Sequence, residues 1–236
     1  MTSDKLQNKD KSQRLERLHK GPDVVWVFDL DNTLYDANTD VFKQIDVRMG
    51  SFISNLLNLD AVEARKVQKD YLRDYGTTLK GLMENHAIDP RDFLDYVHDV
   101  DLTSVAYDKK LAEAITGLEG RKLVFTNGDV PHADRVLARL GIEDDIEGVF
   151  DIALANYSPK PNKDAYDSFL RHFDVDPETA VMVEDMARNL IPASDLGMAT
   201  VWVNANCQWG KMDHSPNHID VEIPALSGWL HQLVHG

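Results

Sequence analysis

Residues 24–36 read VVWVFDLDNTLYD and join five apolar residues to two aspartates that stand one residue apart. A continuous apolar run that ends in turn residues is typical of a strand buried on both faces of a sheet. Asp29 is then the first residue past the strand, and Asp31 follows it closely. Because an unpaired charge at the edge of a core is costly, the two carboxylates indicate a metal or a phosphate at this strand end, with a surface turn as the ordinary alternative.

Further apolar runs predict strands at residues 122–125, 180–183 and 200–203, and a weaker run predicts one near residues 149–154. Helical patterns fill residues 109–116, 133–140, 161–173 and 186–196, with Pro161 in the first turn of the third,. Strands that alternate with helices are typical of an α/β fold with right-handed crossovers. We therefore expect a doubly wound, Rossmann-like sheet that is mostly parallel.

The alternation is interrupted between about residues 38 and 104, where helical periodicity occurs without a clear strand. This interval predicts an all-helical unit inserted after the first strand. We expect a core domain over residues 22–37 and 105–236, a helical cap domain over residues 38–104, and a mobile N-terminal extension over residues 1–21. Residues 206–236 give no functional indication.

The composition is that of an ordinary globular protein, with 43% hydrophobic and 28% charged residues,. The net charge of −15 argues against a nucleic-acid partner, which needs a basic face,. The single cysteine, Cys207, rules out an intramolecular disulfide and is typical of a reducing compartment,. Because we find no apolar run of membrane-spanning length and no signal-peptide core in the first 20 residues, we expect a cytoplasmic protein without a membrane partner.

Polar turns follow three of the predicted strands, at residues 29–33 (DLDNT), 126–128 (TNG) and 184–185 (ED), and Lys160 comes just before a predicted helix. In a doubly wound sheet, the loops at the carboxyl ends of the strands line one crevice. We therefore expect these groups to meet there. Carboxylates suit a hard cation such as Mg²⁺, whereas a hydroxyl, an ammonium and free backbone N–H groups suit phosphate oxygens.

Each group has a chemical role in such a site. Asp29 can attack phosphorus and form an aspartyl-phosphate, and Asp31 can protonate the leaving alcohol and then take a proton from water. Asp29 and Asp185 can supply carboxylates to Mg²⁺, with the Asp31 carbonyl as a further oxygen. The predicted phosphate contacts are Thr126, Lys160 and the backbone amides of Leu30, Asn127 and Gly128.

Taken alone, each signal has an ordinary structural explanation. A TNG tripeptide is common in plain turns, an acidic pair is common at a helix N-terminus, and a single lysine is usually solvated. An EF-hand calcium loop is excluded, because Leu34 stands where glycine is needed and Asp40 where glutamate is needed,. The order of the signals at successive strand ends is what favours a shared site.

With these motifs in order, residues 22–205 resemble the haloacid dehalogenase superfamily. The similar positions are Asp29, Asp31 and Thr33 for its first motif, Thr126 for its second, Lys160-Pro161 for its third, and Glu184-Asp185 for its fourth. The resemblance implies Asp29 as nucleophile, Asp31 as acid/base, and a Mg²⁺ ion held by Asp29, Asp31 and Asp185, with Glu184 as a ligand directly or through water. It also implies that Asn189 orients the site and that the insert is a mobile cap.

Dehalogenases of this superfamily attack carbon and generally lack the second aspartate of the first motif, so the presence of Asp31 implies phosphoryl transfer. Residues 29–35 (DLDNTLY), 75–82 (YGTTLKGL) and 183–190 (VEDMARNL) resemble the pyrimidine 5′-nucleotidase branch. That resemblance implies hydrolysis of UMP, CMP or related 5′-monophosphates. A phosphatase or mutase for a small phosphorylated metabolite, such as phosphoglycolate or a sugar phosphate, is the alternative enzyme. A regulatory protein without catalysis is the alternative of another class.

The cap residues Tyr75, Thr77 and Thr78 are the expected substrate contacts, and Thr77 or Thr78 is equally well explained as a helix N-cap. Arg48 and His132 are expected on the surface, with a phosphate or sugar contact as the alternative. Trp26 and Trp202 are expected in the core. The sequence leaves the oligomeric state open, a dimer included.

Overall fold

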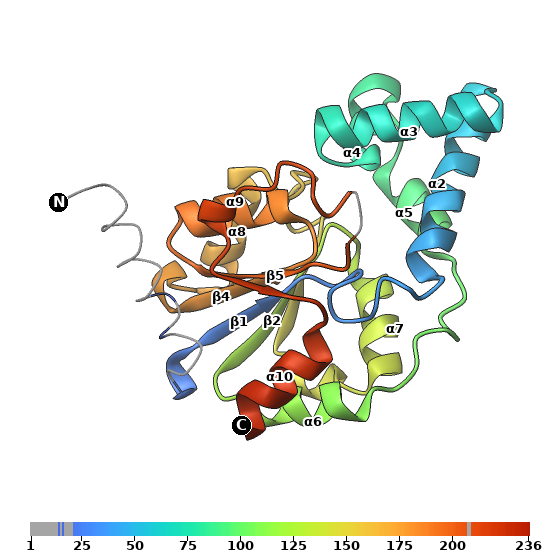
Figure 1. Ribbon diagram of the computed structural model, residues 1–236. Coiled ribbons are helices and arrows are strands. Elements are labelled where there is room, and N and C mark those ends of the chain that lie inside the picture. Colours follow the sequence, from blue (N-terminus) through green and yellow to red (C-terminus); the bar gives the residue numbers. More distant parts are fainter. Residues whose placement is uncertain (1–13, 15, 17–20, 207–208) are drawn as a thin grey trace.

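The computed structural model describes Arg14, Glu16, residues 21–206 and residues 209–236 (Figure 1). Within this part, six parallel strands form one sheet in the order β3-β2-β1-β4-β5-β6. The strands are β1 (Val25–Phe28), β2 (Arg121–Phe125), β3 (Gly148–Phe150), β4 (Ala180–Glu184), β5 (Ala199–Val203) and β6 (Val221–Ile223). The prediction of a doubly wound α/β fold is confirmed. Of the extension expected over residues 1–21, only Arg14, Glu16 and Gly21 are described, and Cys207 also lies outside the described residues.

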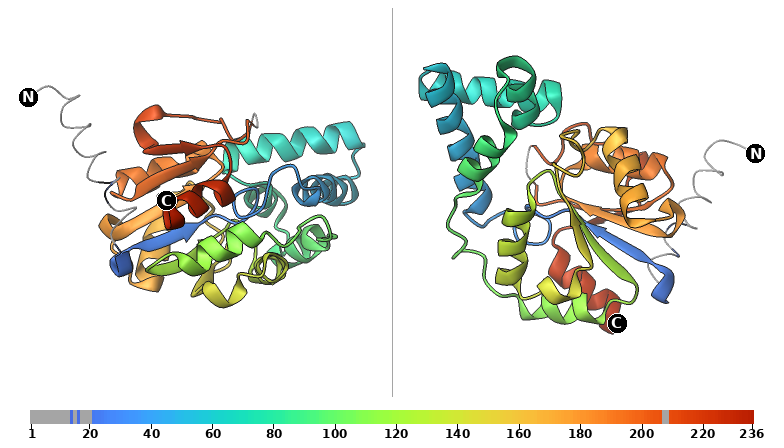
Figure 2. Two further views of the ribbon diagram at one scale, coloured as in Figure 1. Left: turned by 60° about the horizontal axis from the view of Figure 1, so that its bottom comes forward. Right: turned by 180° about the vertical axis from the view of Figure 1, so that it is seen from behind.

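Helices cover both faces of the sheet (Figures 1 and 2). One face packs against α6 (Lys109–Gly117), α7 (Val130–Leu140) and α10 (Leu226–His235), and the other against α8 (Lys163–Phe173) and α9 (Ala187–Asp195). Side chains alternate across a strand, so Trp26 and Phe28 of β1 join the first core and Val25 and Val27 join the second. This double burial explains why β1 is apolar throughout.

Four helices lie together beyond the carboxyl ends of the strands (Figure 1). They are α2 (Val41–Leu57), α3 (Ala61–Tyr75), α4 (Thr78–His86) and α5 (Pro90–His98). Three of them begin at a side chain that accepts backbone N–H groups, a favourable N-cap: Asp60 for α3, Thr77 for α4 and Asp89 for α5. Here we call these helices the cap helices. The proposed domain limits at residues 38 and 104 remain predictions.

The structure differs from the sequence prediction at several elements. α7 begins at Val130 instead of residue 133, because Asp129 caps it, and β3 ends at Phe150, short of the predicted residue 154. β6 and α10 were not predicted; β6 has three residues at the edge of the sheet, too few for a clear apolar run. α8 begins at Lys163, two residues after Pro161, because residues 159–162 form a turn in which Asn162 N donates to Pro159 O (2.8 Å). For β6 and α8, edge pairing and a local turn decide the bounds of the element.

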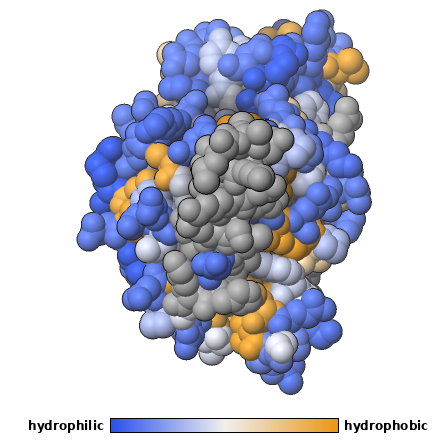
Figure 3. Space-filling model, turned by 60° about the vertical axis from the view of Figure 1, so that its left-hand side comes forward, coloured by the Kyte–Doolittle hydropathy of each residue, from blue (hydrophilic) through white to orange (hydrophobic). Residues whose placement is uncertain are grey.

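Among the helices of the described residues, none combines the length and apolar character that a membrane crossing requires. Outside the grey atoms, the face of the molecule in Figure 3 is mainly hydrophilic, with smaller apolar areas between the polar ones.

Four aromatic rings pack under α8 on one face of the sheet. Phe169 is fully buried, its ring stacks on Phe125 with centroids 5.0 Å apart, and it meets Phe150 edge-on at 5.7 Å. Tyr166 contacts Phe125 from the same helix at 5.1 Å. Because Phe125 ends β2, this cluster fixes α8 against the strand that leads into residues 126–128.

Truncation of Phe169 should therefore be costly. We expect Phe169→Ala to lower the free energy of unfolding by about 3–5 kcal/mol, the usual cost of a phenylalanine-sized cavity, as measured by urea denaturation. Val62→Ala, at a side chain that is 79% exposed, should change it by no more than about 0.5 kcal/mol. A loss below about 1 kcal/mol for Phe169→Ala would show that the cluster is not a packed core.

Candidate active site

The acidic turns meet at the point where the strand order reverses. β1 and β4 are neighbours in the sheet, and the chain leaves them in opposite directions, toward β2 and toward β5. Asp29 N donates to Val183 O (2.9 Å), so Asp29 is held beside the end of β4. Glu184 is the last residue of β4 and Asp185 follows it. This switch point is the position at which open α/β sheets bind ligands.

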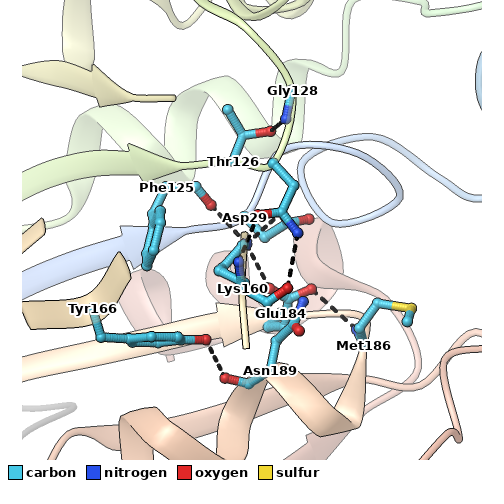
Figure 4. Close-up of polar contacts among 10 residues, drawn as sticks. Asp29, Phe125, Thr126, Gly128, Lys160, Tyr166, Glu184, Met186 and Asn189 are labelled. Atoms are coloured by element: carbon cyan, nitrogen blue, oxygen red, sulfur yellow. Dashed lines mark hydrogen bonds and ion pairs between the residues drawn. The ribbon is translucent and has the colours of Figure 1, made fainter. Parts of the chain in front are cut away.

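Lys160 lies at the centre of the site (Figure 4). Its Nζ donates to Asp29 Oδ1 (2.8 Å), Glu184 Oε2 (2.7 Å) and Phe125 O (2.7 Å), and the residue is 1% exposed. An ammonium has three hydrogens to donate, so this buried cation is fully hydrogen-bonded. The carboxylates of Asp29 and Glu184 outweigh the effect of burial and raise the pKa of Lys160, which keeps it charged.

Asn127 holds the segment that carries Lys160. Its side chain accepts from Lys160 N (2.8 Å) and donates to Lys160 O (3.2 Å). Thr126 is buried, and its hydroxyl accepts from Gly128 N (2.9 Å). The predicted second and third motifs are therefore joined by direct hydrogen bonds, which the sequence separation of about 30 residues does not suggest.

Negative charge exceeds positive charge at this strand end. Asp29, Glu184 and Asp185 each offer a carboxylate oxygen, and these oxygens lie within 4.8 Å of one another. Burial and repulsion from Glu184 raise the pKa of Asp29 to about 7, although Lys160 opposes the shift. Burial, Glu184 and Asp29 also raise the pKa of Asp185 well above its usual range. A divalent cation would relieve this repulsion, and oxygen donors are the ligands that Mg²⁺ prefers, so the donor set fits such an ion.

Asp31 lies in a different environment from Asp29. Its Oδ1 accepts from Tyr35 Oη (2.6 Å) and from His132 Nε2 (2.9 Å). Burial alone would raise the pKa of Asp31, but the interactions with His132 and Tyr35 outweigh it and lower the pKa to about 2. The two aspartates of one turn therefore differ in proton affinity, as expected for groups with different roles.

His132 was expected on the surface, and that prediction is wrong. Its side chain is 0% exposed and contacts Asp31. α7 begins directly after the turn at residues 126–128, with Asp129 as its N-cap. A helix that starts at the carboxyl end of a strand places its first turn near the crevice. The position of His132 in the first turn after residues 126–128 could therefore have predicted its contact with the site.

A cavity of about 590 Å³ lies between these residues and the cap helices. Asp29, Asp31, Thr126, Lys160 and Asp185 line it from the core side. Further core residues on its wall are Asn127, Gly128, Glu184 and Asn189, whereas Leu30 is buried, and its carbonyl accepts from Leu34 N (3.0 Å). The Asn189 carbonyl accepts from the Tyr166 hydroxyl (Figure 4).

The predicted cap residues differ in their positions. Thr77 and Thr78 line the cavity; Thr77 Oγ1 caps α4 by accepting from Lys80 N (3.1 Å), and Thr78 Oγ1 donates to Gln68 O (3.2 Å). Tyr75 packs edge-on against Tyr71 and is not among the described residues that line the cavity.

Arg48 and three tryptophans have different environments. Arg48 donates to Tyr96 O (2.6 Å) and pairs with Asp99, so its guanidinium is engaged within the cap helices. Trp26 and Trp202 are buried in the core, as expected. Trp209 also lines the cavity, with Lys69 Nζ 5.1 Å from its ring centroid. Sequence reasoning missed Trp209, because no motif or periodicity marks its segment.

Comparisons with known proteins agree with this arrangement. A family model described as haloacid dehalogenase-like hydrolase matches residues 25–197. Phosphate metabolism protein 8 of Saccharomyces cerevisiae is 35% identical over 137 residues, which make up 53% of this chain and 42% of the yeast protein. The match therefore spans less than half of that relative.

Solved structures share the fold at low identity. A haloacid dehalogenase-type (HAD) phosphatase from Thermococcus onnurineus has a TM-score of 0.60 and 18% identity, over 90% of this chain and 98% of that one. The L-2-haloacid dehalogenase of Xanthobacter autotrophicus has a TM-score of 0.54 and 17% identity, with the same coverage. Since both a phosphatase and a dehalogenase are similar to this chain, the fold alone does not distinguish the two reactions.

The raised pKa of Asp29 gives a pH dependence with a definite sign. A carboxyl in an unfolded chain has a pKa of about 3.9, whereas that of folded Asp29 is about 7. The folded state therefore binds this proton more tightly, and the stabilisation is present below about pH 4 and is lost as the pH rises through 7.

In chelator, we expect the wild-type protein to lose more stability between pH 5 and pH 8 than Asp29→Asn, which cannot ionise. Urea denaturation of both proteins at the two pH values measures the difference. Asp134→Asn, at an exposed position of α7, is the control and should keep the wild-type dependence. Equal pH dependence in wild type and Asp29→Asn would contradict the raised pKa.

Proposed function

Because this chain belongs to the haloacid dehalogenase-like hydrolases, we propose that it is a Mg²⁺-dependent phosphatase that hydrolyses pyrimidine nucleoside 5′-monophosphates. The observation that carries the proposal is the pair Asp29 and Asp31 at one strand end, where Asp29 is buried, Asp31 is partly buried and both line the cavity. An attack on carbon would have no use for the second carboxylate. The name of the yeast relative refers to phosphate metabolism, which agrees with a phosphate ester as substrate.

The first step uses Asp29 as nucleophile. A carboxylate oxygen of Asp29 attacks phosphorus, the bond from phosphorus to the ester oxygen breaks, and that oxygen leaves with the proton of Asp31. Asp31 is held as a carboxylate in the free protein. An arriving phosphate dianion adds negative charge beside it and favours its protonated form, which is the form that donates.

The second step returns the site to the state that attacked the substrate, with Asp29 ionised and Asp31 protonated. Water attacks the phosphorus of phospho-Asp29, Asp31 takes the proton, and the bond from phosphorus to the aspartate oxygen breaks. Inorganic phosphate leaves, the Asp29 carboxylate is restored, and Asp31 again holds its proton. In this proposal the positive charge of Lys160 and the backbone amide of Asn127 stabilise charge on the transferring oxygens. Gly128 N already donates to Thr126 Oγ1 (2.9 Å), so its predicted phosphate contact would replace that hydrogen bond.

Asp29, Glu184 and Asp185 would hold the metal ion, directly or through water, with the Asp31 carbonyl as a further oxygen. When bound, Mg²⁺ neutralises negative charge on the phosphoryl group and on these carboxylates. The buried carboxylates remain close to one another through their contacts with Lys160. The site therefore keeps its shape while the charge of the substrate changes.

The size and lining of the cavity support a nucleotide. Its volume of about 590 Å³ lies within the range of typical small-molecule sites, and it is larger than phosphoglycolate needs. The cap helices contribute apolar and polar groups to the wall, including Phe42, Met49, Gln68 and Thr77, and the core contributes Trp209. An aromatic ring with amide and hydroxyl groups suits a nucleobase and ribose.

A substrate panel tests the proposal. Phosphate release is measured for UMP, CMP, dUMP, TMP, AMP, GMP, phosphoglycolate and glucose phosphates, with Mg²⁺ and with chelator. We expect Mg²⁺-dependent release confined to pyrimidine monophosphates. Release from the small acids or sugars instead would support the phosphatase reaction and contradict the proposed nucleotide substrate. No release from any panel member would favour a mutase or a regulatory protein.

Substitution of Asp31 tests its role separately. We expect Asp31→Asn to lower kcat by about 10²–10⁴-fold, the usual contribution of acid–base catalysis, while nucleotide binding measured by calorimetry stays within about threefold. The asparagine keeps the shape of the side chain, so loss of turnover would report the lost proton transfer. Normal phosphate release by this variant would contradict the acid/base assignment.

A further inference from the structure

A chain of contacts connects the cap helices to Asp31 through two histidines. His132 from α7 contacts Asp31, His98 from α5 stacks on His132, and Asp129 pairs with His98. The catalytic steps proposed above use Asp31 but neither histidine. Neither ring belongs to the four motifs from which the site was predicted.

His132 contacts Oδ1 of Asp31, and no described residue donates a hydrogen bond to Oδ2. Oδ1 accepts both the His132 ring (2.9 Å) and the Tyr35 hydroxyl (2.6 Å). Oδ2 faces the other side: a Cβ atom built on Gly128 would lie 3.7 Å from it and 3.2 Å from Thr126 Oγ1. The two hydrogen bonds therefore fix the carboxylate so that Oδ2 is presented to the loop predicted to bind phosphate.

His132 is itself held rigidly. Its backbone N donates to Asp129 Oδ1 (3.2 Å) in the first turn of α7, and Val130 N donates to Asp151 Oδ2 (3.2 Å). Its Nδ1 is buried with no hydrogen-bond partner among the described residues. Burying a ring with one unpaired nitrogen lowers the stability of the fold. The hydrogen bond from His132 Nε2 to Asp31 is an interaction that can offset this cost.

His98 connects this arrangement to the cap helices. It is the last residue of α5, 8% exposed, and it also lines the cavity. Its ring lies 4.4 Å from that of His132 at an interplanar angle of 11°, and its Nδ1 lies 2.8 Å from Asp129 Oδ1. A movement of α5 away from α7 would remove the stack and admit water to His132.

We propose that His132 is a positioning residue that orients Asp31 for proton transfer, and that His98 fastens His132 when the cap helices lie against the core. The inference rests on the proposed phosphatase function, because it assigns a purpose to the orientation of Asp31. It predicts that proton transfer to the leaving group depends on the position of the cap helices, whereas attack by Asp29 does not.

Two substrates separate these steps. An alkyl phosphate monoester needs a proton on its leaving oxygen, but p-nitrophenyl phosphate has a stable leaving group and does not. Its first turnover therefore reports attack by Asp29 alone, and its later turnovers need Asp31 as base. The test uses the panel member that wild type hydrolyses fastest, together with rapid mixing of p-nitrophenyl phosphate.

His132→Phe keeps a flat ring against His98 but has no donor for Asp31. We expect kcat on the alkyl monoester to fall about 100-fold with KM changed less than about threefold. The same variant should still release about one nitrophenolate per site in a fast burst, followed by slow turnover. His132→Gln retains an N–H donor and should recover at least about tenfold of the lost kcat.

His98→Phe tests the connection without altering α7. It should reduce kcat about 5–10-fold with the same retained burst. His235→Phe, on the exposed end of α10, is the matched control and should stay within about twofold of wild type. Thermal melting and the burst amplitude count the folded sites in every variant, so a fold defect would lower the burst as well as turnover.

Several results would overturn the inference. These are a kcat within threefold of wild type for His132→Phe, an equal loss of burst and alkyl turnover in that variant, or His132→Gln as slow as His132→Phe. Full activity in His98→Phe would overturn the part played by the cap helices. If wild type released phosphate from no panel member and no nitrophenolate, the proposed function would fail first, which distinguishes that failure from this one.

Discussion

The buried ammonium of Lys160 is the constraint on which the site depends. It sits 1% exposed between Asp29 and Glu184 and donates a third hydrogen bond to the carbonyl that ends β2. Three separate segments of the chain therefore meet at one cation. Without it, the carboxylates at the ends of β1 and β4 would repel each other in a poorly solvated space, which is the costly situation that buried charges must avoid. The same balance leaves negative charge in excess, which is why a divalent cation fits.

The sheet delivers these segments to one place. β1 is one of the two central strands, with β2 and β4 on its two sides, so the residues that follow it stand next to the ends of both. Packing of α8 and α9 on one face and of α6, α7 and α10 on the other buries both sides of β1 and makes it rigid. The aspartates thus project from a fixed edge, while the cap helices form the opposite wall of the cavity. A site with one rigid wall and one separate wall can exclude water around a substrate.

The division of roles between the two aspartates follows from their neighbours. Burial and the carboxylate of Glu184 raise the pKa of Asp29 more than Lys160 lowers it, whereas His132 and Tyr35 lower the pKa of Asp31, so the proton affinities of two residues in one turn differ. The donors come from distant parts of the chain: Tyr35 from the segment that leads to the cap helices and His132 from α7. The orientation of Asp31 therefore depends on Tyr35 and on α7. The His98–His132 stack makes it depend on the cap helices as well.

The sequence by itself determined the α/β class, five of the strands and the residues that meet at their carboxyl ends. Short apolar runs, turn residues and charged groups are local properties, and each can be recognised within a few positions. Only the tertiary structure decided that β6 pairs at the sheet edge, that His132 is buried against Asp31, and that Trp209 and His98 reach the cavity. These outcomes depend on which segments are brought together over long sequence separations. The residues next to a histidine or a tryptophan in the sequence do not indicate which side chains it will contact in the fold. The physical reason is that the burial of a side chain and the pairing of a strand depend on the packing of distant segments, whereas secondary-structure propensity and hydrophobic pattern depend only on neighbouring residues.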